Sequence, residues 1–159
     1  MGRPVSGCLL DAAALFAFAV NEPAADEVQV LLSDSPAMST VNAAELVDVT
    51  VRRGHGTPGD VAASLRAFTD AGLRLVPCTI EIAIGSGRLR SSHYHRSRSA
   101  ISIADSVALA TALSLGVPLA TTDQALCTVA AAEGCEVIPL PNSAGRRPKV
   151  AKRGQPHRD

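Results

Sequence analysis

Short apolar runs alternate along the chain with longer stretches in which apolar residues recur at helical spacing. The short runs predict strands at 6–10, 37–41, 73–78, 117–121 and 136–140. The longer stretches predict helices at 12–20, 23–32, 42–53, 57–72, 79–89, 102–115 and 124–133. Strands that alternate with helices are joined by crossover connections, so the pattern predicts an α/β fold with a parallel sheet of about five strands flanked by helices.

Composition agrees with one globular domain. The chain has 159 residues, of which 47% are hydrophobic and 19% charged. Phe16, Phe18, Phe68 and Tyr94 are its only aromatic residues. The core must therefore be built from Ala, Val, Leu and Ile, which suits helices that lie close on a parallel sheet.

The formal net charge of zero conceals an asymmetry along the chain. Residues 1–141 contain fourteen Asp and Glu but nine Lys and Arg, whereas residues 142–159 contain six Lys and Arg and one Asp. We predict a domain at 1–141 and a basic, disordered tail at 142–159. An acidic body with a basic end could meet a polyanion at that end.

Cysteine usage and hydropathy indicate a cytoplasmic protein. The four cysteines form no C-x-x-C pair and have no zinc-site spacing with histidine, as expected of free thiols in a reducing compartment. No signal peptide and no apolar stretch of membrane-spanning length is present.

Four acidic residues fall where the predicted elements meet. Asp11 follows the first strand, Asp123 follows the fourth, and Glu45 and Asp105 open two helices. The carboxyl ends of parallel strands and the amino ends of the following helices share one edge of a sheet, where ligands bind. The four carboxylates are therefore expected to gather in one pocket.

Each of these acids also has a structural explanation. Asp11 and Asp123 could cap the helices that follow them, and Asn42 with Glu45 matches a capping box. Ser102 with Asp105 matches a second capping box. As a group the four favour a pocket, and Asp105 is the most informative because its neighbours are apolar and a half-buried carboxylate is costly unless paired or metal-bound.

A cluster of four carboxylates favours a hard divalent cation. Their mutual repulsion would raise their pKa values unless cations neutralised them. Oxygen ligands without Cys or His favour Mg²⁺ or Mn²⁺ over zinc. Such a site activates water and stabilises charge at a phosphoryl centre, so the predicted chemistry is phosphodiester hydrolysis.

Four segments that contain these acids resemble a known family. LLDAAAL (9–15), STVNAAEL (39–46), SIADSVALATA (102–112) and TTD (121–123) resemble, in order and spacing, the PIN domain and more narrowly the VapC-type toxins of bacterial toxin–antitoxin pairs. The resemblance covers about residues 5–140. It implies a three-layer Rossmann-like fold and metal-dependent endonucleolytic cleavage of RNA, with Asp11, Glu45, Asp105 and Asp123 as catalytic metal ligands. It also implies a homodimer and inhibition by an antitoxin.

The residues around the quartet differ in part from the family pattern. Ala13 stands where members often have Ser or Thr, and Ala125 stands where some have a further acid. Asn42 and Thr121 lie beside the acids and are expected to hydrogen-bond to the carboxylates or to water. The expected site is therefore a minimal one, with its metal count open.

An acidic pocket needs flanking cations to attract RNA. Arg88, Arg90, Arg96 and Arg98 cluster before the Asp105 helix and are the predicted RNA contacts. A plain polar loop is the alternative for this segment.

Other functions are considered beside the nuclease. A non-catalytic PIN-like module that binds RNA or protein is one, although the intact quartet argues against it. A small-molecule phosphatase would need an acid at Ala13, a receiver-type domain would need Asp where Cys78 stands, and no Gly-rich phosphate loop is present.

Overall fold

A five-stranded, all-parallel sheet organises the chain in a computed structural model that describes residues 7–97 and 99–150. The strands are β1 (Leu9–Leu10), β2 (Ala37–Ser39), β3 (Arg74–Val76), β4 (Leu119–Thr121) and β5 (Val137–Pro139). Their order is β3-β2-β1-β4-β5. The chain thus builds outward from β1 in one direction and then crosses back to the other side of β1 at β4.

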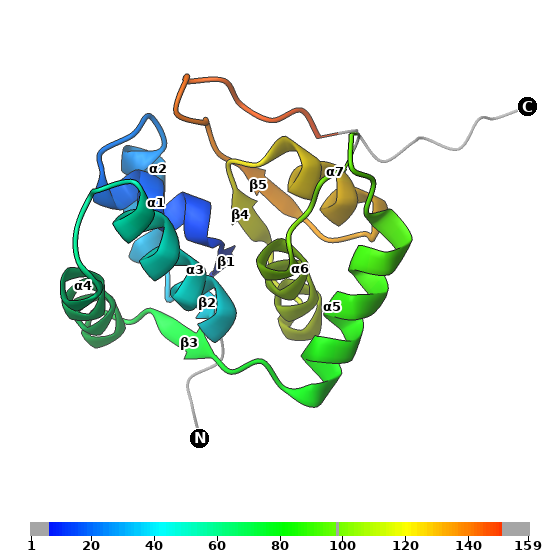
Figure 1. The fold of residues 1–159 in the computed structure, drawn as a ribbon, viewed down its shortest axis with the longest axis horizontal. Coiled ribbons are helices and arrows are strands. Elements are labelled where there is room, and N and C mark those ends of the chain that lie inside the picture. Colours follow the sequence, from blue (N-terminus) through cyan, green and yellow to red (C-terminus); the bar gives the residue numbers. More distant parts are fainter. Residues whose placement is uncertain (1–6, 98, 151–159) are drawn as a thin grey trace, which may run out of the picture.

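Seven helices in the described residues cover this sheet (Figure 1). They are α1 (Ala12–Ala19), α2 (Ala25–Leu32), α3 (Thr40–Arg52), α4 (Pro58–Asp70), α5 (Ile80–His93), α6 (Ile103–Leu115) and α7 (Gln124–Ala132). Figure 1 shows α1 to α4 on one side of the strands and α5 to α7 on the other. The predicted α/β fold with a parallel sheet between two helical layers is confirmed.

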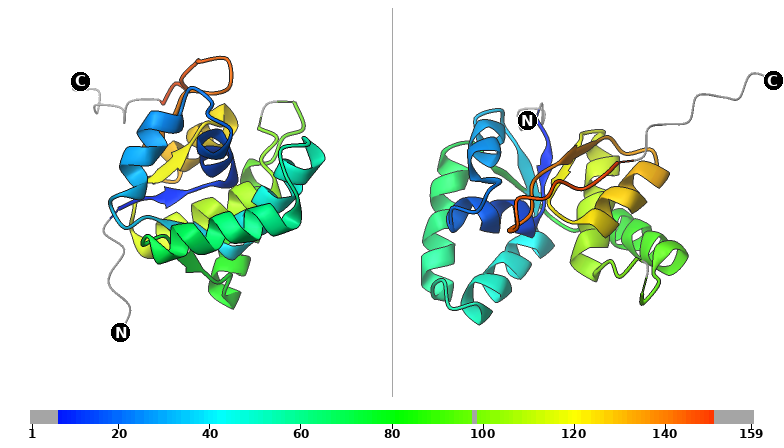
Figure 2. Two further views of the ribbon diagram at one scale, coloured as in Figure 1. Left: turned by 90° about the vertical axis from the view of Figure 1, so that its left-hand side faces the viewer. Right: turned by 90° about the horizontal axis from the view of Figure 1, so that it is seen from above.

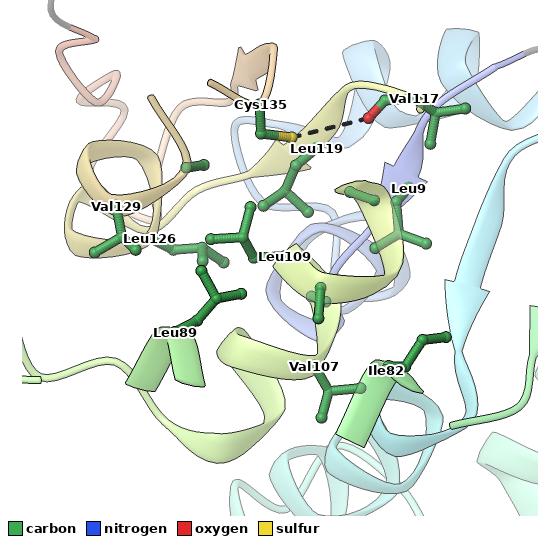
Figure 3. Close-up of a cluster of buried hydrophobic side chains, with 14 of the residues drawn as sticks. Leu9, Ile82, Leu89, Val107, Leu109, Val117, Leu119, Leu126, Val129 and Cys135 are labelled. Carbon is green, nitrogen blue, oxygen red and sulfur yellow. Dashed lines mark hydrogen bonds between the residues drawn. The ribbon is translucent and has the colours of Figure 1, made fainter. Parts of the chain in front are cut away.

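The period of two along the strands divides the core between the two faces of the sheet. Leu9 packs with α5, α6 and α7 in one buried cluster, while Leu10 packs with α1, α2 and Met38 in the other. Leu119 joins the first cluster and its neighbour Ala120 joins the second. Figure 3 shows the first cluster, in which leucine and valine side chains interdigitate. Fully buried aliphatic strands of this kind are expected of a sheet covered on both faces.

Several predicted boundaries are wrong, and those of α3 and α5 show why. The third predicted helix does not begin at Asn42, because Ser39 caps it and accepts a hydrogen bond from the Asn42 backbone N–H at 3.0 Å. The helix predicted to end at Leu89 continues to His93. α5 continues through Gly85 and Gly87, and a Cβ at Gly85 would meet the Ala110 methyl group of α6 only at ordinary contact distance.

Residues 142–150, which we assigned to the tail, contact the domain. The Arg147 guanidinium forms a two-point ion pair with Glu27 of α2, at 2.9 and 2.7 Å. The Gln124 side chain accepts from the Lys149 N–H at 2.7 Å and donates to the Lys149 carbonyl at 2.8 Å. Figures 1 and 2 show this orange-to-red segment crossing between the α2 side and the α7 side of the sheet. Residues 151–159 of the predicted tail lie outside the described residues, so the predicted domain boundary stays a prediction.

The cysteines and the helices give two further observations. Cys8, Cys78, Cys127 and Cys135 are all free thiols. Within residues 7–97 and 99–150, every helix is too short or too polar to span a membrane.

Candidate acidic site

Asp11 lies where β1 ends and α1 begins, beside β4. Its side chain is 2% exposed, and Oδ1 caps α1 by accepting a hydrogen bond from the Ala14 N–H at 2.8 Å. Its own N–H donates to the Ala120 carbonyl of β4 at 3.3 Å. The strand order reverses between β1 and β4, which is the place where open parallel sheets bind ligands.

Asp123 follows β4 at the same edge and is more exposed than Asp11. Its Oδ1 caps α7 by accepting from the Leu126 N–H at 2.7 Å. Its own N–H donates to the Thr121 hydroxyl oxygen at 3.0 Å, and Thr121 is fully buried. A hydrogen-bonding interaction with the Thr121 side chain also lowers the pKa of Asp11. One hydroxyl therefore ties the two strand-end acids together.

Asp105 is half-buried in the first turn of α6 and completes a capping box with Ser102. Oδ2 of Asp105 accepts from the Ser102 N–H at 2.6 Å, and the Asp105 N–H donates to the Ser102 hydroxyl at 3.0 Å. The predicted capping role of Asp105 is therefore real. It does not exclude a second role, because one carboxylate oxygen is left over.

Glu45 lies in α3, and the capping box predicted for it with Asn42 is wrong. Because Ser39 caps α3, Glu45 falls in the second turn, where no backbone N–H needs a cap. Instead, Glu45 Oε2 accepts from the Asn42 side-chain amide at 3.3 Å. That amide also donates to the Ala104 carbonyl at 3.3 Å, beside Asp105. Asn42 is fully buried and links Glu45 to the first turn of α6.

The electrostatics of the four acids link them into one group. Burial, with smaller contributions from the charges of Asp105 and Glu45, raises the pKa of Asp11 to about 7 against the lowering effect of hydrogen bonds from Thr121 and Ala14. Burial also raises the pKa of Glu45, and the Asp105 charge adds to the rise. The pKa of Asp105 is raised by burial and then by the Asp123 charge. Desolvation and like charge both disfavour the ionised forms of these carboxylates, and a nearby cation would favour them.

The side chains in the described residues do not form a ready metal cage. Their ion pairs do not include any of the four acids. No three His, Cys, Asp or Glu side chains among the described residues stand close enough together to hold a metal ion in this arrangement. The donor chemistry nevertheless fits a hard cation, because all four groups are carboxylates and each capping Asp has one oxygen free of its cap.

Cys127 is the one buried thiol beside this group. Burial raises its pKa to about 12, with the charges of Asp11 and Asp123 as further causes. The thiol is therefore protonated at neutral pH. The protonated thiol is a poor nucleophile at this position.

The arginines predicted to bind RNA have contacts of other kinds. Arg88 pairs with Glu133 at 3.5 Å, and Arg90 donates to the Ile101 carbonyl at 3.2 Å while its guanidinium lies 4.3 Å from the Tyr94 ring centre. Glu133 ends α7, whereas Asp123 begins it. A helix of nine residues is about 14 Å long, so the Arg88 partner Glu133 and Asp123 lie at opposite ends of α7. Arg96 is exposed, and Arg98 lies outside the described residues.

Cations that we assigned to the tail line a hollow beside Asp123. Arg146, Arg147 and Lys149 line a hollow of about 530 Å³ together with Asp123 and Gln124. Only the basic composition of residues 142–159 signalled them, because no periodicity in the sequence places this segment against α7. Their position depends on long-range contacts with α2 and α7.

Comparison with known proteins identifies the family. The family model described as PIN domain matches residues 8–132, and the chain belongs to this family. No curated protein sequence matches the chain.

Solved structures with the same fold include three bacterial proteins. A toxin–antitoxin complex from Klebsiella pneumoniae matches with a TM-score of 0.57 and 17% identity, over 74% of this chain and 88% of the other. VapC20 from Mycobacterium tuberculosis, described as a sarcin–ricin loop cleaving toxin, matches with a TM-score of 0.57 and 16% identity, over 71% of this chain and 87% of the other. DNA-bound VapBC from Salmonella typhimurium has a TM-score of 0.61 and 17% identity, over 83% of this chain and 96% of the other. At these identities the likeness shows a shared fold.

Proposed function

We propose that this chain is the toxin of a toxin–antitoxin pair and acts as a Mg²⁺- or Mn²⁺-dependent endoribonuclease. Membership of the PIN family supports the proposal, as do folds shared with VapC proteins, one of which is described as an RNA-cleaving toxin. The proposed partners are an RNA substrate, a cognate antitoxin and a second copy of the chain, and the proposed compartment is the cytoplasm.

The observation that carries the proposal is the electrostatic coupling of a buried carboxylate to its neighbours. Asp11 is almost fully buried, and both Glu45 and Asp105 raise its pKa. Burying a carboxylate among other carboxylates destabilises a fold unless the carboxylate binds a cation or another ligand. A bound divalent cation would offset both the cost of desolvating Asp11 and the repulsion between the carboxylates.

Asp11, Glu45, Asp105 and Asp123 would hold the metal. When bound, it would supply a polarised water and charge stabilisation at the scissile phosphodiester. The caps fix each Asp by one oxygen and leave the other for the ligand, while Asn42 orients Glu45 and Thr121 orients Asp11. Asp11 carries a proton below about pH 7 and would release it on metal binding.

A non-catalytic PIN module that binds RNA or protein is the second candidate. One observation favours it, namely that no three acids in the described part of the chain stand close enough to hold a metal in the present arrangement. The two candidates differ in whether metal binding brings the carboxylates together.

Cleavage of labelled RNA by the purified protein tests the proposal, with Mg²⁺ or Mn²⁺ in one arm and EDTA in the other. We expect cleavage only with metal and its loss in Asp11→Asn, which keeps a capping oxygen but removes the charge. Asp26→Asn changes an exposed acid in the first turn of α2 and should leave cleavage intact. Cleavage that persists in EDTA or in Asp11→Asn would refute the metal site, and wild-type protein without cleavage under any condition would favour the second candidate.

A further inference from the structure

The hollow beside Asp123 has a wall of cationic residues from the segment after β5. One side of the hollow is formed by Ala13, Thr122, Asp123 and Gln124, and the other by Asn142 and residues 146–149. The match to the family model covers residues 8–132, so this wall lies outside the matched residues. The hollow opens next to an acid of the proposed active site.

Hydrogen bonds hold this wall in a fixed shape. Asn142 Oδ1 accepts from the N–H groups of Ala144 and Arg146, each at 3.0 Å, and the Asn142 N–H donates to the Arg146 carbonyl at 2.9 Å. Gly145, with φ of 74°, closes this turn. Beyond it, Pro148 is buried and Lys149 is held through its backbone by the Gln124 side chain.

The three cations of the wall differ in what neutralises them. The Arg147 guanidinium is satisfied by Glu27 and by the Pro139 carbonyl, and therefore acts as an anchor. The Arg146 and Lys149 side chains are exposed and have no hydrogen-bond or ion-pair partner among the described residues. Two positive charges are thus positioned by the fold without being neutralised by it.

We propose that Arg146 and Lys149 bind backbone phosphates of an RNA strand and lead it past Asp123 into the acidic site. This inference rests on the proposed function, because it names the surface that would hold the substrate. Four carboxylates repel a polyanion, so cations next to them are needed to bring a phosphodiester near. Arg146 and Lys149 line the same hollow as Asp123, whereas Arg88 pairs with Glu133 at the far end of α7.

Binding of a short fluorescein-labelled RNA, measured by anisotropy in EDTA at several salt concentrations, tests the inference without cleavage. Arg146→Gln and Lys149→Gln, singly and together, remove the charges without removing a hydrogen bond of the described residues. Each lost phosphate contact lowers the salt slope on single strands by about 0.7, which is about a fivefold rise in Kd near 0.1 M salt. We therefore expect a rise of about 25-fold for the double variant.

Arg66→Gln, on the exposed face of α4, is the charge-matched control and should change Kd little. The inference would be overturned if Arg66→Gln lost as much RNA affinity as Arg146→Gln or Lys149→Gln. It would also be overturned if the double variant had an unchanged Kd, or if the wild-type protein did not bind RNA. Arg96→Gln tests the segment first predicted to bind RNA, and a loss confined to that variant would return the role to it. Because binding is measured without metal, weakened binding in an enzyme that cleaves nothing would leave this inference standing while the proposed function fails.

Discussion

Helices α4 and α6 begin with the same capping box, in opposite surroundings. At α4, Asp60 Oδ2 accepts from the Thr57 N–H at 2.8 Å, and at α6, Asp105 Oδ2 accepts from the Ser102 N–H at 2.6 Å. Hydrogen bonds to Thr57 lower the pKa of Asp60, which is fully exposed. Burial and the Asp123 charge raise the pKa of Asp105 in spite of equivalent bonds to Ser102.

The opposite pKa shifts distinguish Asp60, which is only a helix cap, from Asp105, which is also a candidate metal ligand. Equivalent hydrogen bonds favour ionisation in both carboxylates, so the opposite shifts come from what lies around each box. Asp60 has water around it, whereas Asp105 has the apolar start of α6 and three other acids. A capping motif in the sequence therefore does not decide whether its acid has a further role, and the two boxes form a natural pair of variants.

The largest expected effect is on RNA cleavage. Asp105→Asn keeps a capping oxygen but removes a charge that the proposed metal site needs. A loss of about 3 kcal/mol of transition-state stabilisation corresponds to a fall of more than about 10²-fold in kcat/KM. Asp60→Asn makes the same chemical change at the exposed box and should cleave at the wild-type rate. Equal rates in the two variants would show that Asp105 is only a cap.

The largest expected effect on stability, as distinct from activity, is its dependence on pH. Between the usual pKa of 3.8 and about 7, folded Asp11 holds a proton that the unfolded chain releases. The free energy of unfolding in EDTA should therefore fall as pH rises through this window, by up to about 4 kcal/mol, and level off above it. Urea titrations at several pH values measure this fall, and Asp11→Asn should flatten it.

The acids of the two capping boxes should affect the pH dependence of the free energy of unfolding in opposite directions. Asp60 has a lowered pKa, so the stability that it contributes is present above its unfolded pKa and is lost as pH falls through its folded value. Asp105 has a raised pKa, so its contribution is present at low pH and is lost as pH rises through the folded value. If Asp60→Asn and Asp105→Asn changed the pH dependence of the free energy of unfolding in the same direction, this comparison would be contradicted.

Metal stabilisation should be smaller but specific. Mg²⁺ or Mn²⁺ at about 100 times its Kd should stabilise the folded wild-type chain by about 2.7 kcal/mol. Thermal melting should show this gain in Asp60→Asn and little of it in Asp105→Asn. A gain of the same size in both variants would assign the metal to another part of the chain.

The smallest expected effect concerns Thr121. Thr121→Val removes the hydrogen bond that lowers the Asp11 pKa and leaves the Asp123 N–H without its partner, so a loss of about 1 kcal/mol is expected. The pH at which cleavage begins should also move upward, because Asp11 would hold its proton longer. Thr121→Ser should restore the wild-type profile, and a valine variant with an unchanged profile would assign Thr121 to packing alone.

Local sequence patterns predicted much of the fold and part of the site. The apolar runs located all five strands because both faces of this sheet are covered, and the helix predicted at 57–72 and the Ser102 capping box located the starts of α4 and α6. Asp11 and Asp123 could be placed at one edge because each follows a parallel strand directly. The start of α3 was misplaced because Ser39 and Asn42 are both good caps, and only the end of β2 selects Ser39.

The sequence by itself determined the α/β alternation, the strand-end positions of Asp11 and Asp123, and the capping of α6 by Asp105, because these depend on residues close together in the chain. The tertiary structure alone decided that Asn42 joins Glu45 to α6. It alone also decided that the pKa of Asp105 is raised by burial, whereas the pKa of Asp60 in the equivalent capping box is lowered. It alone also brought Arg146 and Lys149 to Asp123. These outcomes depend on desolvation and on contacts between residues far apart in the chain, which no local pattern records.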